Sequence, residues 1–185
     1  MGKSVSILIG LAVAGLASAG FAEERSGGLA LQFDDGWRSW LTEVAPRVKA
    51  HGGVASGFVN NRYVEDGRIT MDELRRLQDE YGWEIGSHTA NHQNAPRYVQ
   101  SRGLDAWLAN ELEPSLALLR GGGLRVDALV FPYNASTPEI AAAALKRVGS
   151  YRRVDSLALA AGVRTDGSLP GTSIDTAQYA PVELV

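Results

Sequence analysis

Short apolar segments alternate with helical patterns along this chain, and that alternation limits the folds open to it. The apolar segments lie at residues 29–33, 54–59, 83–87 and 126–131. Their length and the turn-forming residues that bound them are typical of buried strands. Strands that alternate with helices form right-handed β-α-β units with parallel strands. The sequence therefore predicts an α/β fold around a parallel sheet, either open or barrel-shaped.

The connecting segments carry apolar residues three and four positions apart, which predicts helices. The clearest helix begins after Thr70, because Thr70 and Glu73 form a capping-box pattern. Pro114 predicts a kink, or a division into two pieces, in the helix expected over residues 104–120. Residues 93–103 are polar and are predicted to form a loop. Further helices are expected over 37–50 and from 136 onward, and further strands at 151–154, 157–159 and 172–177.

Polar side chains follow the predicted strands at the points where the strands end. In α/β proteins with parallel sheets, such carboxyl ends carry the chemistry. The residues placed there are Asp34, Asp35, Asn60, His88, His92 and Tyr133. The sequence therefore predicts one functional site at this edge of the sheet.

Two of the chain's three histidines, His88 and His92, lie four residues apart, directly after an apolar strand. If the chain enters a helical turn there, both rings point to the same side. With a carboxylate from the first strand they form a 2-His-1-carboxylate set, which leaves coordination positions open for water and substrate. This pattern indicates a catalytic rather than a structural metal site.

The composition excludes several other classes of site. The chain has 185 residues, 45% hydrophobic and 21% charged, which is enough for one domain with a core. Its formal net charge is −3, and no basic patch suggests a nucleic-acid partner. The absence of cysteine excludes disulfides, thiolate catalysis and zinc thiolate sites. Any metal must therefore be held by His, Asp or Glu.

The N-terminus has the pattern of a secretory signal peptide. Lys3 precedes an apolar run at residues 5–16, which is shorter than the ~20 residues that span a membrane. We expect a signal peptide over residues 1–22, with cleavage near Ala19 or Ala22, and a catalytic domain over 23–185. Export to the periplasm or the extracellular space follows, with no stable membrane span after cleavage. An uncleaved N-terminal anchor is the alternative.

Three short motifs resemble those of a known family. Phe-Asp-Asp-Gly at 33–36, His-Thr-x-x-His at 88–92 and Phe-Pro-Tyr at 131–133 resemble the first three motifs of the polysaccharide deacetylases, the NodB-homology group of carbohydrate esterases (family four). The resemblance covers residues 29 to about 153. It implies a distorted, incomplete (β/α) barrel, and metal-dependent removal of N-acetyl groups from an N-acetylated polysaccharide.

The resemblance also implies roles for individual residues. Asp34 would be the general base, and Asp35 would join His88 and His92 as the third metal ligand. Tyr133 would donate its backbone N–H to the oxyanion. The expected ion is one divalent metal, Zn²⁺, with Co²⁺, Ni²⁺ or Fe²⁺ as alternatives, in a monomeric protein. Residues expected to bind substrate are Trp37, Asn60 and Pro132.

The chain departs from the family pattern in two places. The third motif of the family often begins with an Arg that orients the base; here Arg152 or Arg153 is the candidate for that role. The family also uses a histidine near the C-terminus as general acid, and this chain has no histidine after His92. His51 is expected at a helix C-terminus on the opposite face. The domain is also short against the ~250 residues of a full barrel, which predicts a C-terminally truncated or divergent member.

Two other functions fit parts of this pattern. A non-haem iron oxygenase also uses two histidines and a carboxylate, but it would require a jelly roll of many short strands. A non-catalytic carbohydrate-binding relative would account for the missing general acid. Oxygen consumption would identify the first, and a histidine encoded beyond Val185 would argue against the second.

Overall fold

A computed structural model describes residues 30–154 and 168–171. These residues form one all-parallel sheet, whose strands lie side by side in sequence order. The strands are β1 Leu31–Asp35, β2 Ala55–Val59, β3 Glu84–Ser87, β4 Ala128–Val130, β5 Ser150–Val154 and β6 Ser168–Gly171. Because all neighbours are parallel, the carboxyl ends of successive strands lie at one edge of the sheet.

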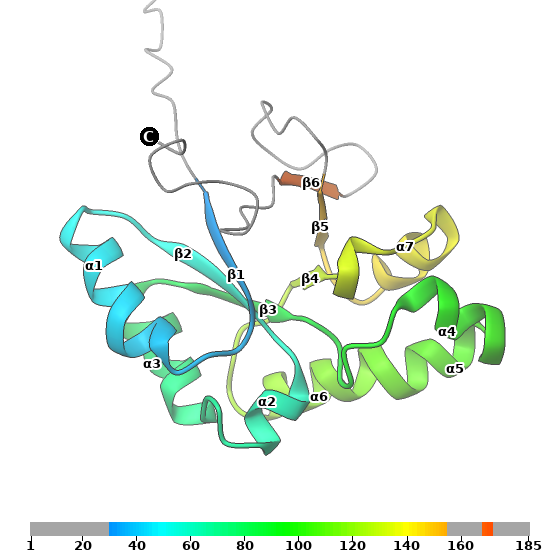
Figure 1. The fold of residues 1–185 in the computed structure, drawn as a ribbon, viewed down its shortest axis with the longest axis horizontal. Coiled ribbons are helices and arrows are strands. Elements are labelled where there is room, and N and C mark those ends of the chain that lie inside the picture. The colour runs from blue at the N-terminus through cyan, green and yellow to red at the C-terminus, as the bar shows by residue number, and fades with distance from the viewer. Residues whose placement is uncertain (1–29, 155–167, 172–185) are drawn as a thin grey trace, which may run out of the picture.

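The sheet is curled into a half-barrel (Figure 1). Three strands separate β1 from β5 in the sheet order, yet Arg152 on β5 donates two hydrogen bonds to Asp34 on β1. A flat sheet would hold these strands about 19 Å apart, at ~4.8 Å for each step between neighbours. The fold is therefore the distorted, incomplete (β/α) barrel that was predicted.

Helices flank the outer side of the curled sheet (Figure 1). The main core lies between the helices and the sheet and is rich in large apolar side chains such as Trp40, Leu77, Ile85 and Trp107. The helices are η1 Trp40–Val44, α1 Ala45–Ala50, α2 Asn61–Glu65, α3 Met71–Tyr81, α4 Ala95–Arg102, α5 Leu104–Trp107, η2 Leu108–Leu112, α6 Glu113–Gly121, η3 Pro132–Asn134 and α7 Pro138–Ala144.

The inner side of the half-barrel has its own small apolar cluster, formed by Phe58, Ala128 and Val130. Gly86 on β3 leaves the space that the Phe58 ring occupies. A Cβ atom at Gly86 would lie 2.5 Å from that ring and 2.8 Å from the Ala128 carbonyl oxygen. The missing side chain thus allows a large aromatic residue to fill the narrow interior beside the site.

The predicted helix after Thr70 is confirmed as α3. The Thr70 hydroxyl accepts a hydrogen bond from the Glu73 N–H at 3.2 Å, and the Glu73 carboxylate accepts one from the Thr70 N–H at 2.8 Å. The helix ends at Gly82 in the left-handed region, with φ of 71°. His51 is the C-terminal cap of α1, as expected.

Residues 93–103 do not form the predicted loop. They contain α4, because the Asn94 side chain accepts a hydrogen bond from the Arg97 N–H at 3.2 Å and Pro96 lies in the first turn. Both features favour a helix start. Apolar residues are few in this segment, so the helical period was missed.

Pro114 predicted a kink or a division, and the stretch expected over 104–120 is indeed divided, into α5, η2 and α6. Pro114 lies in the first turn of α6, and the irregular part is the π-helical turn η2 just before it. A proline in a first turn sacrifices no intrahelical hydrogen bond.

Some expectations concern other parts of the chain. The signal peptide and its cleavage site, and the strands expected at 157–159 and 172–177, lie outside the described residues. In the part of the chain that the structure describes, no helix combines the length and apolarity needed to cross a membrane.

Candidate metal centre and active site

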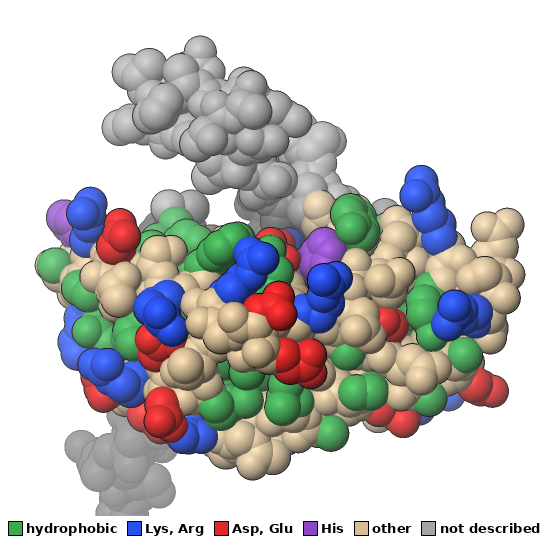
Figure 2. Space-filling view, turned by 60° about the horizontal axis from the view of Figure 1, so that its bottom comes forward, with side chains coloured by type: hydrophobic (Ala, Val, Ile, Leu, Met, Phe, Trp, Pro, Cys, Tyr) green, Lys and Arg blue, Asp and Glu red, His purple; other side chains and the backbone are tan. Residues whose placement is uncertain are grey.

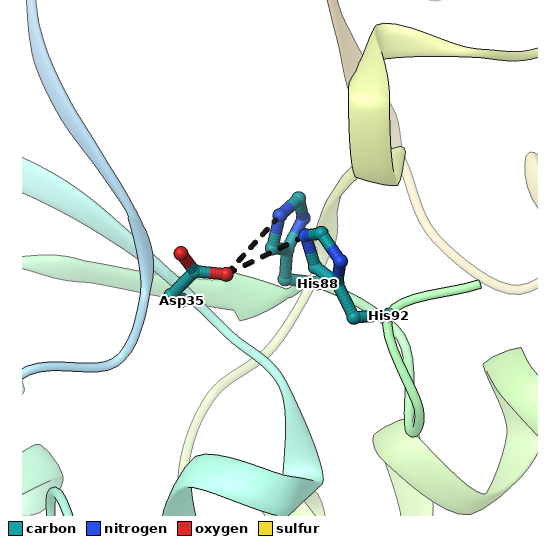
Figure 3. A group of neighbouring side chains, drawn as sticks. All are labelled: Asp35, His88 and His92. Atoms are coloured by element: carbon teal, nitrogen blue, oxygen red, sulfur yellow. Dashed lines mark ion pairs between the residues drawn. The ribbon is translucent and has the colours of Figure 1, made fainter. Parts of the chain in front are cut away.

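Asp35, His88 and His92 come together at the carboxyl edge of the sheet (Figure 3). Asp35 Oδ1 lies 3.5 Å from His92 Nε2 and 3.9 Å from His88 Nε2. One donor atom from each residue lies within 4.8 Å of the others. Two imidazole nitrogens and a carboxylate oxygen at this spacing surround a point that a divalent ion can occupy.

The backbone at this edge is strained. Five non-glycine residues among those described have positive φ, and all lie at or after the carboxyl ends of strands: Asp35 (81°), Thr89 (64°), His92 (55°), Tyr133 (59°) and Asn134 (52°). Each left-handed residue costs about 1–2 kcal/mol. Such strain concentrates at functional sites, where the surrounding structure holds it in place.

The segment between the two histidines is not a helical turn, the condition under which their spacing would place both rings on one side. Residues 88–94 form no helix in the structure. The left-handed conformations of Thr89 and His92 turn the chain instead, so that the rings of His88 and His92 meet at 4.8 Å between centroids, edge to face. The predicted convergence of the rings occurs, but through a different backbone path.

His88 is prepared to act as a neutral ligand. Its Nδ1 lies 2.8 Å from the Val130 carbonyl oxygen, which accepts a hydrogen bond from the ring and leaves Nε2 facing Asp35. Burial lowers the pKa of His88 below the ordinary histidine value. A metal-binding histidine usually donates the N–H of the ring nitrogen that does not face the metal to a carbonyl group or a carboxylate.

Asn60 orients Asp35 and does not face a substrate as predicted. Its side chain is 1% exposed. Its Nδ2 donates to Asp35 Oδ1 at 3.2 Å, and its Oδ1 caps α2 by accepting the Tyr63 N–H at 3.1 Å. Because both ends of the amide have partners inside the protein, the substrate-binding role expected for Asn60 is wrong.

Glu111 supports the loop that carries His92, and sequence reasoning missed it. Glu111 is 1% exposed, on the π-helical turn η2. Its two carboxylate oxygens accept the Asn91 N–H and the Asn91 side-chain amide, both at 3.0 Å, and its carbonyl oxygen accepts the Ala90 N–H at 2.9 Å. An acid within a largely apolar helical stretch was the available signal.

Asp34 lies next to the three-residue cluster but has a different partner. Arg152 donates to both of its oxygens, at 2.9 and 2.5 Å, and the Arg152 side chain is only 10% exposed. The Arg152 guanidinium also lies 5.8 Å from the Phe58 ring centroid. Arg152, one of the two arginines proposed to orient the base, thus contacts Asp34 through both oxygens.

The remaining predicted residues lie around the centre. Tyr133 is 66% exposed, and its ring meets the His92 ring at 4.8 Å. Pro132 is buried at the start of η3. Trp37 is 43% exposed and meets the Tyr63 ring edge to face at 5.0 Å. Both aromatic rings are therefore partly exposed to solvent, with the Arg68 guanidinium 5.0 Å from the Trp37 ring centroid.

A sequence profile described as polysaccharide deacetylase matches residues 22–149, which is more than half of the chain. The chain belongs to the polysaccharide deacetylase family. A search of curated proteins found no match. The all-parallel sheet of the described residues is also unlike the double antiparallel sheet that the oxygenase alternative requires.

Solved structures of other proteins have the same fold as this chain. A de-N-acetylase from Aggregatibacter actinomycetemcomitans is similar with a TM-score of 0.69 and 17% identity, over 84% of this chain and 73% of that one. IcaB from Ammonifex degensii is similar with a TM-score of 0.66 and 18% identity, over 86% of this chain and 73% of that one. The deacetylase PplD of Streptococcus pyogenes was solved in complex with acetate. It is similar with a TM-score of 0.62 and 20% identity, over 78% of this chain and 63% of that one.

The three-residue cluster fits the divalent metal of this family. The set of one carboxylate and two imidazoles leaves open coordination positions. Asn60 and the Val130 carbonyl group hydrogen-bond two of the three ligands, as outer partners do in metal sites. These two contacts therefore hold Asp35 and His88 in the orientation that a metal ion needs.

Proposed function

We propose that this protein is an exported, metal-dependent hydrolase that removes N-acetyl groups from an N-acetylated sugar polymer. The observation that carries the proposal is that a group of possible metal ligands and a separate carboxylate lie next to each other at one edge of the sheet. Asp35, His88 and His92 converge on one point, while the adjacent Asp34 is turned to Arg152. One aspartate is thus available to a metal ion and the other to a proton.

Asp35, His88 and His92 would hold the ion, for which we propose Zn²⁺, with Co²⁺, Ni²⁺ or Fe²⁺ able to substitute. When bound there, such an ion polarises the acetyl carbonyl and lowers the pKa of water. The protein keeps the ligands in place through Asn60 and the Val130 carbonyl group. No cysteine or serine nucleophile is needed for this reaction.

We assign Asp34 as the general base. Arg152 fixes the plane of its carboxylate with two hydrogen bonds, and each carboxylate oxygen keeps a further lone pair. Asp34 can therefore accept the proton of the water that attacks the acetyl carbon. A positioned base of this kind contributes about 10²–10⁴-fold to the rate.

The same proton can complete the reaction. The leaving nitrogen must be protonated before the C–N bond breaks, and the nearest candidate donor is Asp34 after it has taken the proton from water. We assign the Tyr133 N–H as the donor to the oxyanion, since η3 carries Tyr133 to the edge of the centre with φ of 59°. Trp37 is proposed to pack against the sugar rings, and Pro132 to shape the wall of the site beside Tyr133.

The test is product analysis with metal-loaded protein and oligomers of N-acetylglucosamine. We expect acetate and free amine in equal amounts, and loss of both in Asp34→Asn with the metal retained. Arg47→Gln, on the exposed face of α1, is a suitable control because it lies outside this site. Intact N-acetyl groups after prolonged incubation of the fully metal-loaded protein would refute the proposal.

A second candidate is a carbohydrate-binding protein without turnover. One observation favours it: besides His88 and His92 the chain has only His51, which caps α1 at the opposite end of β2 and cannot act as the family's acid. Binding of N-acetylated oligomers with no release of acetate would identify this function.

A further inference from the structure

A large groove extends from the metal centre across the face that carries α4. Its volume is about 990 Å³, and the residues that matter for its chemistry are Arg62, Asn91, His92, Arg97, Arg102 and Tyr133. Ligand pockets usually measure about 300–1,000 Å³. The groove is therefore large enough for sugar units beyond the one that is deacetylated.

The groove is basic, although the whole chain has a formal net charge of −3. Arg62, Arg97 and Arg102 are exposed and form no ion pair with any described residue. The Arg102 guanidinium only lies against the Tyr98 ring, at 5.4 Å. Figure 2 shows basic side chains beside the central histidine and over the right-hand part of the molecule, where α4 lies.

No acid in the groove neutralises these arginines. Its single lining carboxylate is Glu111, which is buried and uses both oxygens to hold Asn91. Elsewhere on the described surface, several arginines contact an acid: Arg38, Arg76 and Arg147 each contact a glutamate. Among the described residues, the groove thus gathers three arginines without an acidic partner where a substrate chain would lie.

The other lining groups suit a sugar chain. Asn91, Gln93 and Asn110 present amide oxygens that can accept hydrogen bonds from hydroxyl groups, and Tyr98 and Tyr133 present rings that can pack on sugar faces. An arginine fork matches a carboxylate in geometry and charge. Neutral sugars offer these three guanidinium groups no negative charge to pair with.

We propose that the groove binds carboxylate-bearing sugar units next to the N-acetylated unit, so that the substrate is an anionic polysaccharide. This inference rests on the proposed function, because it places the acetyl group at the metal centre. Each arginine at an exposed site should contribute about two- to fivefold to affinity. The three together should contribute about tenfold or more, and salt should weaken binding by screening.

The experiment compares two tetrasaccharides on the full metal-loaded chain. One is a neutral oligomer of N-acetylglucosamine, and the other is a hyaluronan fragment in which N-acetylglucosamine alternates with glucuronate. We expect at least about tenfold tighter binding of the second, measured by calorimetry at low salt. The combined variant Arg62→Gln, Arg97→Gln and Arg102→Gln should abolish that preference, while Arg47→Gln should keep it.

Equal affinity for the two oligomers, or the same loss in Arg47→Gln, would overturn the inference. A sulfated fragment bound as tightly as the carboxylated one would overturn the assignment to carboxylates. Failure of the proposed function is separate, because the binding measurement does not depend on turnover. Acetate release from neutral oligomers with no anionic preference would leave the function standing and reject this inference alone.

Discussion

Replacing Arg152 with glutamine should separate orientation of the base from metal binding. Arg152→Gln removes both hydrogen bonds to Asp34, at 2.9 and 2.5 Å. A hydrogen bond to a charged group contributes about 1.5–3 kcal/mol, and breaking a fully buried ion pair costs about 3–5 kcal/mol. The Asp34 side chain is 33% exposed, so water replaces part of the loss. We expect a decrease of about 2 kcal/mol in the free energy of unfolding.

The same substitution should lower kcat about 10- to 100-fold, as is usual when an outer partner of a metal-site residue is removed. The metal should remain, because Arg152 contacts none of Asp35, His88 and His92 in the described structure. The assays are urea unfolding of metal-free protein, metal content after dialysis, and acetate release. Arg152→Lys keeps the charge but not the fork, so its kcat should fall between those of the wild type and Arg152→Gln.

Arg125→Gln is the matched control, since it removes an exposed ion pair of the same two residue types, Arg125 with Asp79 at 3.1 Å. It should cost less than about 1 kcal/mol and leave kcat unchanged. The reasoning fails if Arg152→Gln loses its metal or keeps wild-type kcat.

Further substitutions address the metal centre itself. His88→Ala or His92→Ala should lose stoichiometric metal after dialysis, because a three-ligand site that loses one ligand also loses its geometry; one retained ion per chain would disprove the assignment. Asp34→Asn should keep the metal and lose hydrolysis, whereas Asp35→Asn should lose both, and equal metal loss in the two would contradict this division. Glu111→Gln replaces one acceptor by a donor beneath the His92 loop, so metal affinity should fall about 10-fold or more in a chelator competition, with unchanged affinity counting against a positioning role.

Much of the fold could be predicted because its signals are local. The strand lengths and the capping box at Thr70 and Glu73 depend on neighbouring residues only. The α4 helix was missed because its start is set by Asn94 rather than by an apolar period. Pro114 indicates a break in the helix over 104–120, but not that the irregular part is the π-helical turn η2.

Parts of the site could likewise be predicted from local signals, and other parts could not. His88 and His92 could be predicted because short motifs carry them, but their backbone path depends on left-handed residues that the sequence does not reveal. Arg152 and Asp34 are 118 residues apart and meet only because the sheet curls, so the sequence alone could not show this contact. Asn60 was predicted at the correct edge with the wrong role, since its partners come from β1 and α2.

The central claim is that one divalent ion held by Asp35, His88 and His92 enables deacetylation. Its most direct test is a titration of metal-free protein with Zn²⁺, in which bound metal and acetate release from N-acetylated oligomers are measured on the same samples. The account predicts that the rate rises in proportion to bound metal and stops rising at one ion per chain, with no such rise in His92→Ala. Hydrolysis at the full rate without metal, or no hydrolysis with one ion bound per chain, would contradict it.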